Sequence, residues 1–277
     1  MSGVDPPDLL ERGSREHYDD AQYYDQTYRS RRDDIEFYRH AARRYGEPVL
    51  DLGGGSGRIA MPLAQDGARV WVLDANARML AAGRDRAART LSDAERARVT
   101  LAEADIRSFR LRRRFPLVIA PFNVLMHLYE PDEFAACFRC VRQHLAPGGR
   151  FIFDVRMPIP SELARNPDRV YRGRPFRHPT LGHGVEYTER FRYDAVKQVQ
   201  HVIMRFAPGA GAPRGSRARE TLLTQRQIFP NELRALLALG GLHLRARHGD
   251  FSGRPLSDDA FVQVIEAATS EIKARRR

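Results

Sequence analysis

Short apolar runs alternate with amphipathic stretches through the first half of the chain. Residues 49–52, 70–74 and 117–120 are runs of this kind, suited to strands that are covered on both faces. Helical periodicity follows the first run, from about Arg58 to Asp66, and returns from Asp132 to Leu145. Strands that alternate with helices predict a parallel sheet with right-handed crossovers over residues 47–156.

The pattern changes after residue 157. A proline-rich stretch leads into three segments of period-2 alternation, which predict an antiparallel sheet. These segments are Val185–Tyr193, Gln198–Phe206 and Glu220–Ile228. A helix is then expected from Pro230 to Leu239, because Pro stands at its start and two glycines follow its end. Two closing strands follow, at residues 242–247 and 261–267.

The two ends of the chain differ from its middle in composition. Residues 1–16 are rich in charge, Pro and Gly and are expected to be disordered, whereas tyrosines recur among charges from residue 17 to 46. We therefore expect five segments: a disordered N-terminus (1–16), a helical cap (17–46), a core (47–157 and 229–270), an inserted antiparallel subdomain (158–228) and a basic tail (271–277).

The first apolar run leads into a glycine-rich loop, from Asp51 to Gly57. The glycines let the backbone approach a ligand, and the helix that follows directs free N–H groups toward it. Residues 55–60 also fit the dinucleotide pattern G-x-G-x-x-A, with Asp74 placed to bind a ribose. However, Asp51 precedes the loop, where a carboxylate repels a pyrophosphate and attracts a ligand with an ammonium and a sulfonium, such as S-adenosylmethionine.

Further motifs follow in order along residues 45–156, and together they resemble the class I S-adenosylmethionine-dependent methyltransferases. The motifs are Val70–Leu80, Ala104–Ile106, Leu117–Ala120, Pro121–Leu128 and Leu145–Asp154. Taken singly, Asp74 is as well explained as a helix cap and Asp105 as a turn residue. The resemblance implies a seven-stranded, mostly parallel, Rossmann-like α/β sheet, with the last strand antiparallel beside the fifth and the inserted antiparallel sheet roofing the active site.

The resemblance also implies which residues bind the cofactor. In the family, the acid after the second strand holds the ribose hydroxyls, and the acid after the third strand takes the adenine amino group. The N-terminal segment is similar to that of the glycine and aminosugar N-methyltransferases, in which an arginine pairs with the cofactor carboxylate. The expected cofactor-binding residues are Tyr24, Arg31, Asp51, Gly53, Gly55, Asp74, Ala75, Met79, Asp105, Ile106, Phe122 and Asn123.

Composition changes this picture little. The formal net charge of +11 is compatible with a nucleic-acid partner, but arginines supply nearly all of the cationic side chains and are spread along the chain. Cys137 and Cys140 have C-x-x-C spacing without a second ligand pair, so we expect ordinary helix residues, and no metal site is expected. No apolar run reaches the roughly 18–20 residues that span a bilayer, and the N-terminus lacks a signal pattern, which favours a cytoplasmic protein.

The expected reaction is in-line methyl transfer to an N or O atom of a small molecule. The enzyme aligns the reactants and excludes water, so a catalytic base is not always needed. His127 is the expected base, because it follows the loop at the mouth of the active site; it is also compatible with a packing role. The alternatives are an RNA or other nucleic-acid methyltransferase and a non-catalytic cofactor-binding module. We expect a monomer or homodimer without membrane or nucleic-acid partners.

Overall fold

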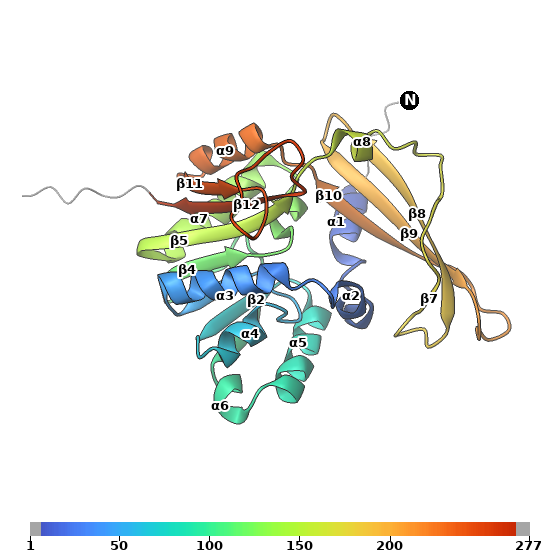
Figure 1. Cartoon of the computed structure of the whole chain (residues 1–277), viewed down its shortest axis with the longest axis horizontal. Coiled ribbons are helices and arrows are strands. Elements are labelled where there is room, and N and C mark those ends of the chain that lie inside the picture. Colours follow the sequence, from blue (N-terminus) through green and yellow to red (C-terminus); the bar gives the residue numbers. More distant parts are fainter. Residues whose placement is uncertain (1–6, 270–277) are drawn as a thin grey trace, which may run out of the picture. The chain divides into compact units, whose positions relative to one another are not determined.

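The computed structural model describes residues 7–269, which divide into two compact units (Figure 1). One unit combines the described residues up to Ser30 with Pro158–Gln227, and the other combines Arg31–Met157 with the residues from Ile228 onward. We call them the insertion unit and the sheet unit. The first six residues and the expected basic tail at 271–277 lie outside the described residues.

The sheet unit is built on seven strands in the order β11-β12-β5-β4-β1-β2-β3. Neighbours from β5 to β3 pair in parallel, whereas β12 runs antiparallel to both β5 and β11. This confirms the expected α/β class and the placement of the last strand. The strands are β1 (Val49–Leu52), β2 (Val70–Asp74), β3 (Val99–Glu103), β4 (Phe115–Ala120), β5 (Leu145–Arg156), β11 (His243–His248) and β12 (Val262–Ala268).

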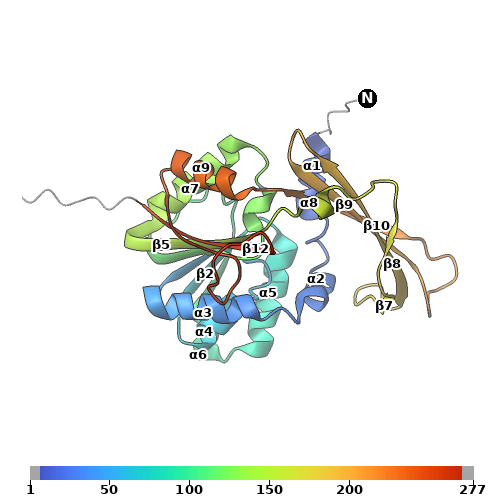
Figure 2. The same ribbon diagram turned by 45° about the horizontal axis from the view of Figure 1, so that its top comes forward.

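Helices cover both faces of this sheet (Figure 2). One face packs against α3 (Asp33–Tyr45), α4 (Ala60–Gln65) and α5 (Ala77–Thr90), and the short α6 (Asp93–Arg96) follows. The other face packs against α7 (Pro131–His144) and α9 (Pro230–Leu239). Cys137 and Cys140 are buried, unbridged residues of α7, as their helical spacing predicts. Strands β1 and β4 are buried almost throughout and mostly apolar, because both of their faces are covered.

The insertion unit contains an antiparallel sheet in the order β10-β9-β8-β6, with β7 also paired to β8. Its three long strands match the period-2 segments of the sequence closely. The strands are β6 (Tyr171–Arg172), β7 (Phe176–Arg177), β8 (Gly184–Asp194), β9 (Val199–Pro208) and β10 (Arg219–Arg226), and the unit also holds helices α1 (Pro7–Arg15), α2 (Ala21–Tyr28) and α8 (Pro160–Leu163). Among the described helices, none has both the length and the hydropathy of a membrane span.

Helix α1 forms where the sequence analysis expected disorder. It contacts β10, whose outer edge would otherwise be unpaired. The Glu16 carboxylate accepts a hydrogen bond from Leu222 N–H at 2.9 Å, and the Thr224 hydroxyl donates to the Leu10 carbonyl at 3.3 Å. The polar composition that suggested disorder serves here to satisfy an edge strand, which local sequence does not reveal.

The division between the units falls inside the segment expected to form one N-terminal cap. Helix α2 belongs to the insertion unit, and α3 belongs to the sheet unit. In α2, Tyr23 packs on β9 through Phe206, with ring centroids 5.1 Å apart. In α3, Tyr38, Ala41 and Ala42 are buried in the core beside α4.

Candidate functional site

Acidic residues lie at or just beyond the carboxyl ends of adjacent strands of the sheet unit. Asp51 lies in β1, Asp74 ends β2, and Asp105 follows β3. Phe122 and Asn123 follow β4. Because these strands are neighbours and run in parallel, their ends share one edge of the sheet, where ligands bind in open α/β folds.

The glycine loop is pinned to the end of β2. Gly53 N–H donates to the Leu73 carbonyl at 2.7 Å, and Gly55 N–H donates to Oδ2 of Asp74 at 2.8 Å. Gly55 has φ +53°, and a Cβ there would lie 2.8 Å from Cε of Met79. A Cβ on Gly53 would lie 2.5 Å from Val124, so Gly53 is needed for space and for its φ of +62°, whereas Gly55 is needed mainly for its conformation.

Asp51 is a fully buried carboxyl group beneath this loop. Neither of its oxygen atoms has a hydrogen-bond partner among residues 7–269. Burial, and then the charge of Asp74, raise the pKa of Asp51 to about 8, although Arg58 acts in the opposite direction. A buried polar group without partners is costly, and one beside a glycine loop indicates a ligand that is cationic or donates hydrogen bonds.

Asp74 supports the loop rather than capping a helix. Its carboxylate accepts from Gly55 N–H through Oδ2 and from Asn76 N–H through Oδ1, both at 2.8 Å. The cap of α5 is Asn76, whose side chain accepts from the N–H groups of Arg78 and Met79. Each oxygen of Asp74 has taken one backbone donor and retains a further acceptor site.

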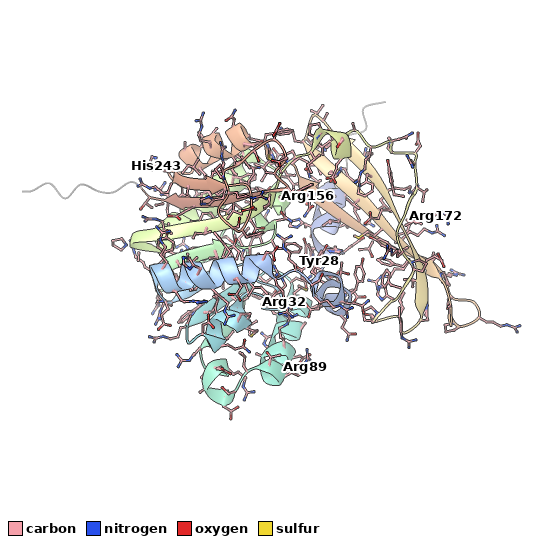
Figure 3. All side chains as sticks on the ribbon, in the orientation of Figure 1. Tyr28, Arg32, Arg89, Arg156, Arg172 and His243 are labelled. Atoms are coloured by element: carbon pink, nitrogen blue, oxygen red, sulfur yellow. The ribbon has the colours of Figure 1, made fainter. Side chains whose placement is uncertain are left out.

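The loop after β4 contains two consecutive non-glycine residues in the left-handed region, Phe122 with φ 63° and Asn123 with φ 67°. Asp154 of β5 holds both: its Oδ1 accepts from Phe122 N–H at 2.9 Å, and its carbonyl accepts from Asn123 N–H at 3.1 Å. Oδ1 of Asn123 accepts from the backbone N–H of Arg156, the residue labelled at the end of β5 in Figure 3, at 2.7 Å. A strained turn that is held this firmly is typical of functional sites.

Arg31 lies over this turn. Its guanidinium carbon is 4.5 Å from the ring centre of Phe122 and 5.4 Å from that of Phe251. Its Nε donates to Oδ2 of Asp34 at 2.9 Å, and one Nη lies 3.8 Å from Oδ2 of Asp154. The side chain remains 33% exposed, so the guanidinium is fixed and still accessible to an anion.

Asp105 has a partner that the sequence analysis did not foresee. Nε of Arg107 contacts both of its oxygens, at 2.9 and 3.0 Å, and Nη2 contacts Oδ2 at 2.6 Å. Hydrogen bonding by Arg107 lowers the pKa of Asp105 despite its partial burial. Arg107 also pairs with Glu133 of α7. Any ligand that approaches Asp105 meets a carboxylate already shared with a guanidinium.

The other expected site residues are more dispersed. Met79 is buried against the glycine loop, Ala75 is exposed after β2, and Ile106 packs partly buried against the core. His127 is the last residue of the short 3-10 helix η1 (Val124–His127) and is half-buried. Tyr24 belongs to the insertion unit, where its ring contacts Tyr18 and Tyr28, the latter labelled in Figure 3.

Sequence reasoning missed residues that organise the site from behind. Asp34 and Asp154 are fully buried, and Tyr38 donates to Oδ1 of Asp154 at 2.8 Å. Arg58 makes a two-pronged ion pair with Asp34, and Arg107 binds Asp105. The spacing of Arg31 and Asp34, one helical turn apart, was a usable signal; the pairing of Asp34 with Arg58 depends on how α3 packs.

Comparison with known proteins identifies the enzyme class. Residues 49–149 match the family model described as a methyltransferase domain. The match identifies a methyltransferase domain at residues 49–149, and the chain is an enzyme of the methyltransferase kind. This match agrees with the class expected from the sequence, and the sheet order given above is consistent with it.

Individual proteins that this chain resembles are also named methyltransferases. A Streptomyces protein named Cypemycin N-terminal methyltransferase is 26% identical over 211 residues, which cover 76% of this chain and 78% of that protein. The CcbJ methyltransferase from Streptomyces caelestis has a TM-score of 0.71 at 24% identity and covers 86% of this chain and 89% of its own. The glycopeptide N-methyltransferase MtfA, solved with S-adenosyl-L-methionine, has a TM-score of 0.58 at 22% identity, covering 85% and 86%. These structures share the fold.

Proposed function

We propose that this enzyme transfers a methyl group from S-adenosylmethionine to an amine nitrogen of a small molecule or short peptide. When bound, the cofactor supplies an electrophilic methyl group on a sulfonium. The observation that carries the proposal is Asp51, whose two buried oxygens have no hydrogen-bond partner in the described chain and lie beside the glycine loop. A carboxyl group of this kind suits a cationic ligand and opposes a pyrophosphate.

The other strand ends fit the same ligand. The spare acceptor capacity of Asp74 suits ribose hydroxyls, and Gly55 leaves room for the ligand next to it. Arg31 presents a fixed guanidinium to a carboxylate. Asp105 and Ile106 are proposed for the adenine end, with Arg107 sharing the Asp105 carboxylate. Tyr24, Ala75, Met79, Phe122 and Asn123 stay proposed contacts.

Nitrogen is favoured over oxygen as the acceptor atom. MtfA is named a glycopeptide N-methyltransferase, and the Streptomyces relative is named Cypemycin N-terminal methyltransferase. An amine only has to lose its proton to become nucleophilic, whereas a hydroxyl acceptor requires a base in the transition state. His127 is proposed as the group that takes the proton in either case.

The cofactor is tested by calorimetry with purified protein. S-adenosylmethionine and S-adenosylhomocysteine are expected to bind, and NAD is not. Detectable NAD binding, with no binding of either adenosyl ligand, contradicts the proposal.

The acceptor is tested by a screen of paired amines and alcohols of matched skeleton, scored by formation of S-adenosylhomocysteine. Methylation confined to the amines supports nitrogen, and methylation confined to the alcohols contradicts it. His127→Gln is expected to lower turnover by about 100-fold with cofactor affinity unchanged if the imidazole is the base. A mild effect leaves positioning as the source of rate.

A nucleic-acid acceptor is the second candidate, favoured only by the net charge of +11. Contacts with phosphates release counterions, so activity on RNA or DNA would fall steeply with salt. A small acceptor should show a shallow dependence. We expect the shallow dependence on salt. We also propose that the protein is a monomer or homodimer, which light scattering would measure, and that it is cytoplasmic.

A further inference from the structure

Two guanidinium groups meet one buried carboxylate at the start of α3. Nη1 and Nη2 of Arg58 donate to Oδ1 and Oδ2 of Asp34 at 2.9 and 2.6 Å. Nε of Arg31 donates to the same Oδ2 at 2.9 Å. Asp34 is completely buried and Arg58 is 12% exposed, so solvent screens these bonds little.

The cluster joins parts of the chain that face the candidate site. Arg58 follows Gly57 directly, at the end of the glycine loop, and Arg31 lies two residues before the first residue of α3. Both guanidinium carbons lie over the ring of Phe122, at 4.5 Å for Arg31 and 5.2 Å for Arg58. The carboxylate of Asp34 therefore connects the loop, the turn after β4 and the exposed arginine.

Two buried carboxyl groups face these guanidiniums: Asp34 bonds both, and Oδ2 of Asp154 lies 3.8 Å from an Nη atom of Arg31. Burial would raise the pKa of Asp34, but hydrogen bonds and charges from Arg58 and Arg31 outweigh burial and lower it. Arg31 uses Nε on Asp34, and none of its Nη atoms has a hydrogen-bond partner among the described residues. Its outer edge is therefore held in place and available to an anion.

We propose that Asp34 is a positioning residue, which holds Arg31 ready for the carboxylate of the cofactor and links it through Arg58 to the glycine loop. The inference rests on the proposed cofactor. Asp34 itself is buried behind the two arginines and acts through them. A carboxylate ligand then meets a guanidinium whose rotamer is already set, so less entropy is lost on binding.

The test compares S-adenosylmethionine with its decarboxylated analogue, which keeps the sulfonium and the ammonium and lacks only the carboxylate. In Asp34→Asn, the dissociation constant for S-adenosylmethionine is expected to rise about 10-fold or more, as for a lost hydrogen bond to a charged group. The constant for the analogue is expected to stay within about twofold. Equal weakening of both ligands, or of neither, overturns the proposal.

Two further variants keep the result interpretable. Asp33→Asn removes the exposed neighbouring carboxylate in the same helical turn and is expected to change neither constant. Arg31→Gln alone should raise the dissociation constant for S-adenosylmethionine as much as the double variant with Asp34→Asn does, since Asp34 acts through Arg31. Additive losses contradict a positioning role.

The folded state must be checked as well, because removing one partner of a buried ion pair is strongly destabilising. Thermal unfolding is followed for every variant. If Asp34→Asn does not fold, Arg58→Lys keeps a positive charge and loses the two-pronged bond; it should weaken S-adenosylmethionine selectively, and equal weakening of the analogue counts against the proposal. Failure of the unmodified protein to bind S-adenosylmethionine at all refutes the proposed function instead.

Discussion

The two units bury polar side chains for different ends. In the insertion unit, His17 is enclosed by the rings of Tyr18, Tyr23, Tyr24 and Tyr28, with centroids 5.2 to 6.0 Å away. In the sheet unit, Asp51 lies next to a glycine loop and meets no hydrogen-bond donor in the described chain. A polar group surrounded by aromatic rings contributes to packing. A polar group without a hydrogen-bond partner beside a glycine loop is available to a ligand.

Both groups are electrically neutral at pH 7, but they respond to pH in opposite directions. Burial lowers the pKa of His17 to about 4, and burial raises the pKa of Asp51 to about 8. His17 therefore lowers the free energy of unfolding as pH falls from 6.5 toward 4, because the unfolded chain takes up the proton first. Asp51 lowers the free energy of unfolding as pH rises from about 4 to 8, because the carboxyl group ionises first in the unfolded chain.

The largest effect is expected from Gly55→Val. The side chain would collide with Met79 and would demand φ +53° of a β-branched residue. Cofactor binding should weaken on the order of 100-fold or more, as measured by calorimetry. Gly67→Val is the matched control, since Gly67 also has a positive φ, and a Cβ there would meet nothing within 4 Å. Similar losses in both variants would show that backbone strain, rather than the site, is responsible.

The pH dependence of binding is the next largest effect. Asp51 must ionise to pair with a cationic ligand, so affinity should rise about 10-fold per pH unit below its pKa, from pH 6 toward 8. About one proton should be released on binding at pH 7, which calorimetry in buffers of different ionisation enthalpy detects. Asp51→Asn should remove both effects. An unmodified protein with a flat profile would exclude Asp51 as the counter-charge.

Asp74→Ala tests the ribose assignment. The loss of charge-assisted hydrogen bonds should weaken cofactor binding by about 1–3 kcal/mol, with little change in the unfolding midpoint. Asp85→Ala, which removes an exposed carboxylate from α5, should leave affinity unchanged. Full affinity in Asp74→Ala would mean that Asp74 serves only to hold Gly55 and Asn76.

The smallest expected effect lies in the insertion unit. Between pH 7 and pH 5, His17 should cost about 1–2 kcal/mol of unfolding free energy, since its pKa is lowered to about 4. His17→Phe keeps an aromatic ring and should remove this part of the pH dependence, as followed by denaturant unfolding. His40→Phe, at an exposed position of α3, is the control. Cofactor affinity at pH 7 should not respond to either variant.

Much of the architecture was predictable because its signals are local. The helix expected at Pro230–Leu239 has these bounds in the structure, with Pro at its start and Gly240 at its C-cap. Alternation along residues 185–228 predicted β8, β9 and β10, since one face of each strand is packed and the other is not. The acids at the strand ends were visible because a parallel strand is otherwise apolar.

Other features required contacts between distant segments. Disorder was expected for residues 1–16, but α1 forms against β10. Glu16 and Leu222, which share a hydrogen bond there, are 206 positions apart in the sequence. The link between Asp34 and Arg58 spans 24 positions and depends on the packing of α3 on α4. No periodicity marks such pairs, because their partners lie in separate segments of the chain and each segment has its own local pattern.

By itself, the sequence determined the class of fold and the place of the glycine loop, since periodicity acts over a few residues. It also placed Asp51, Asp74 and Asp105 at one edge of a sheet. Only the tertiary structure decided which hydrogen-bond partners each acid has there. Asp51 has none within residues 7–269, Asp74 accepts from backbone N–H groups, and Asp105 accepts from Arg107. Burial and hydrogen-bond partners set whether a carboxyl group is available to a ligand, and both arise from segments brought together by folding.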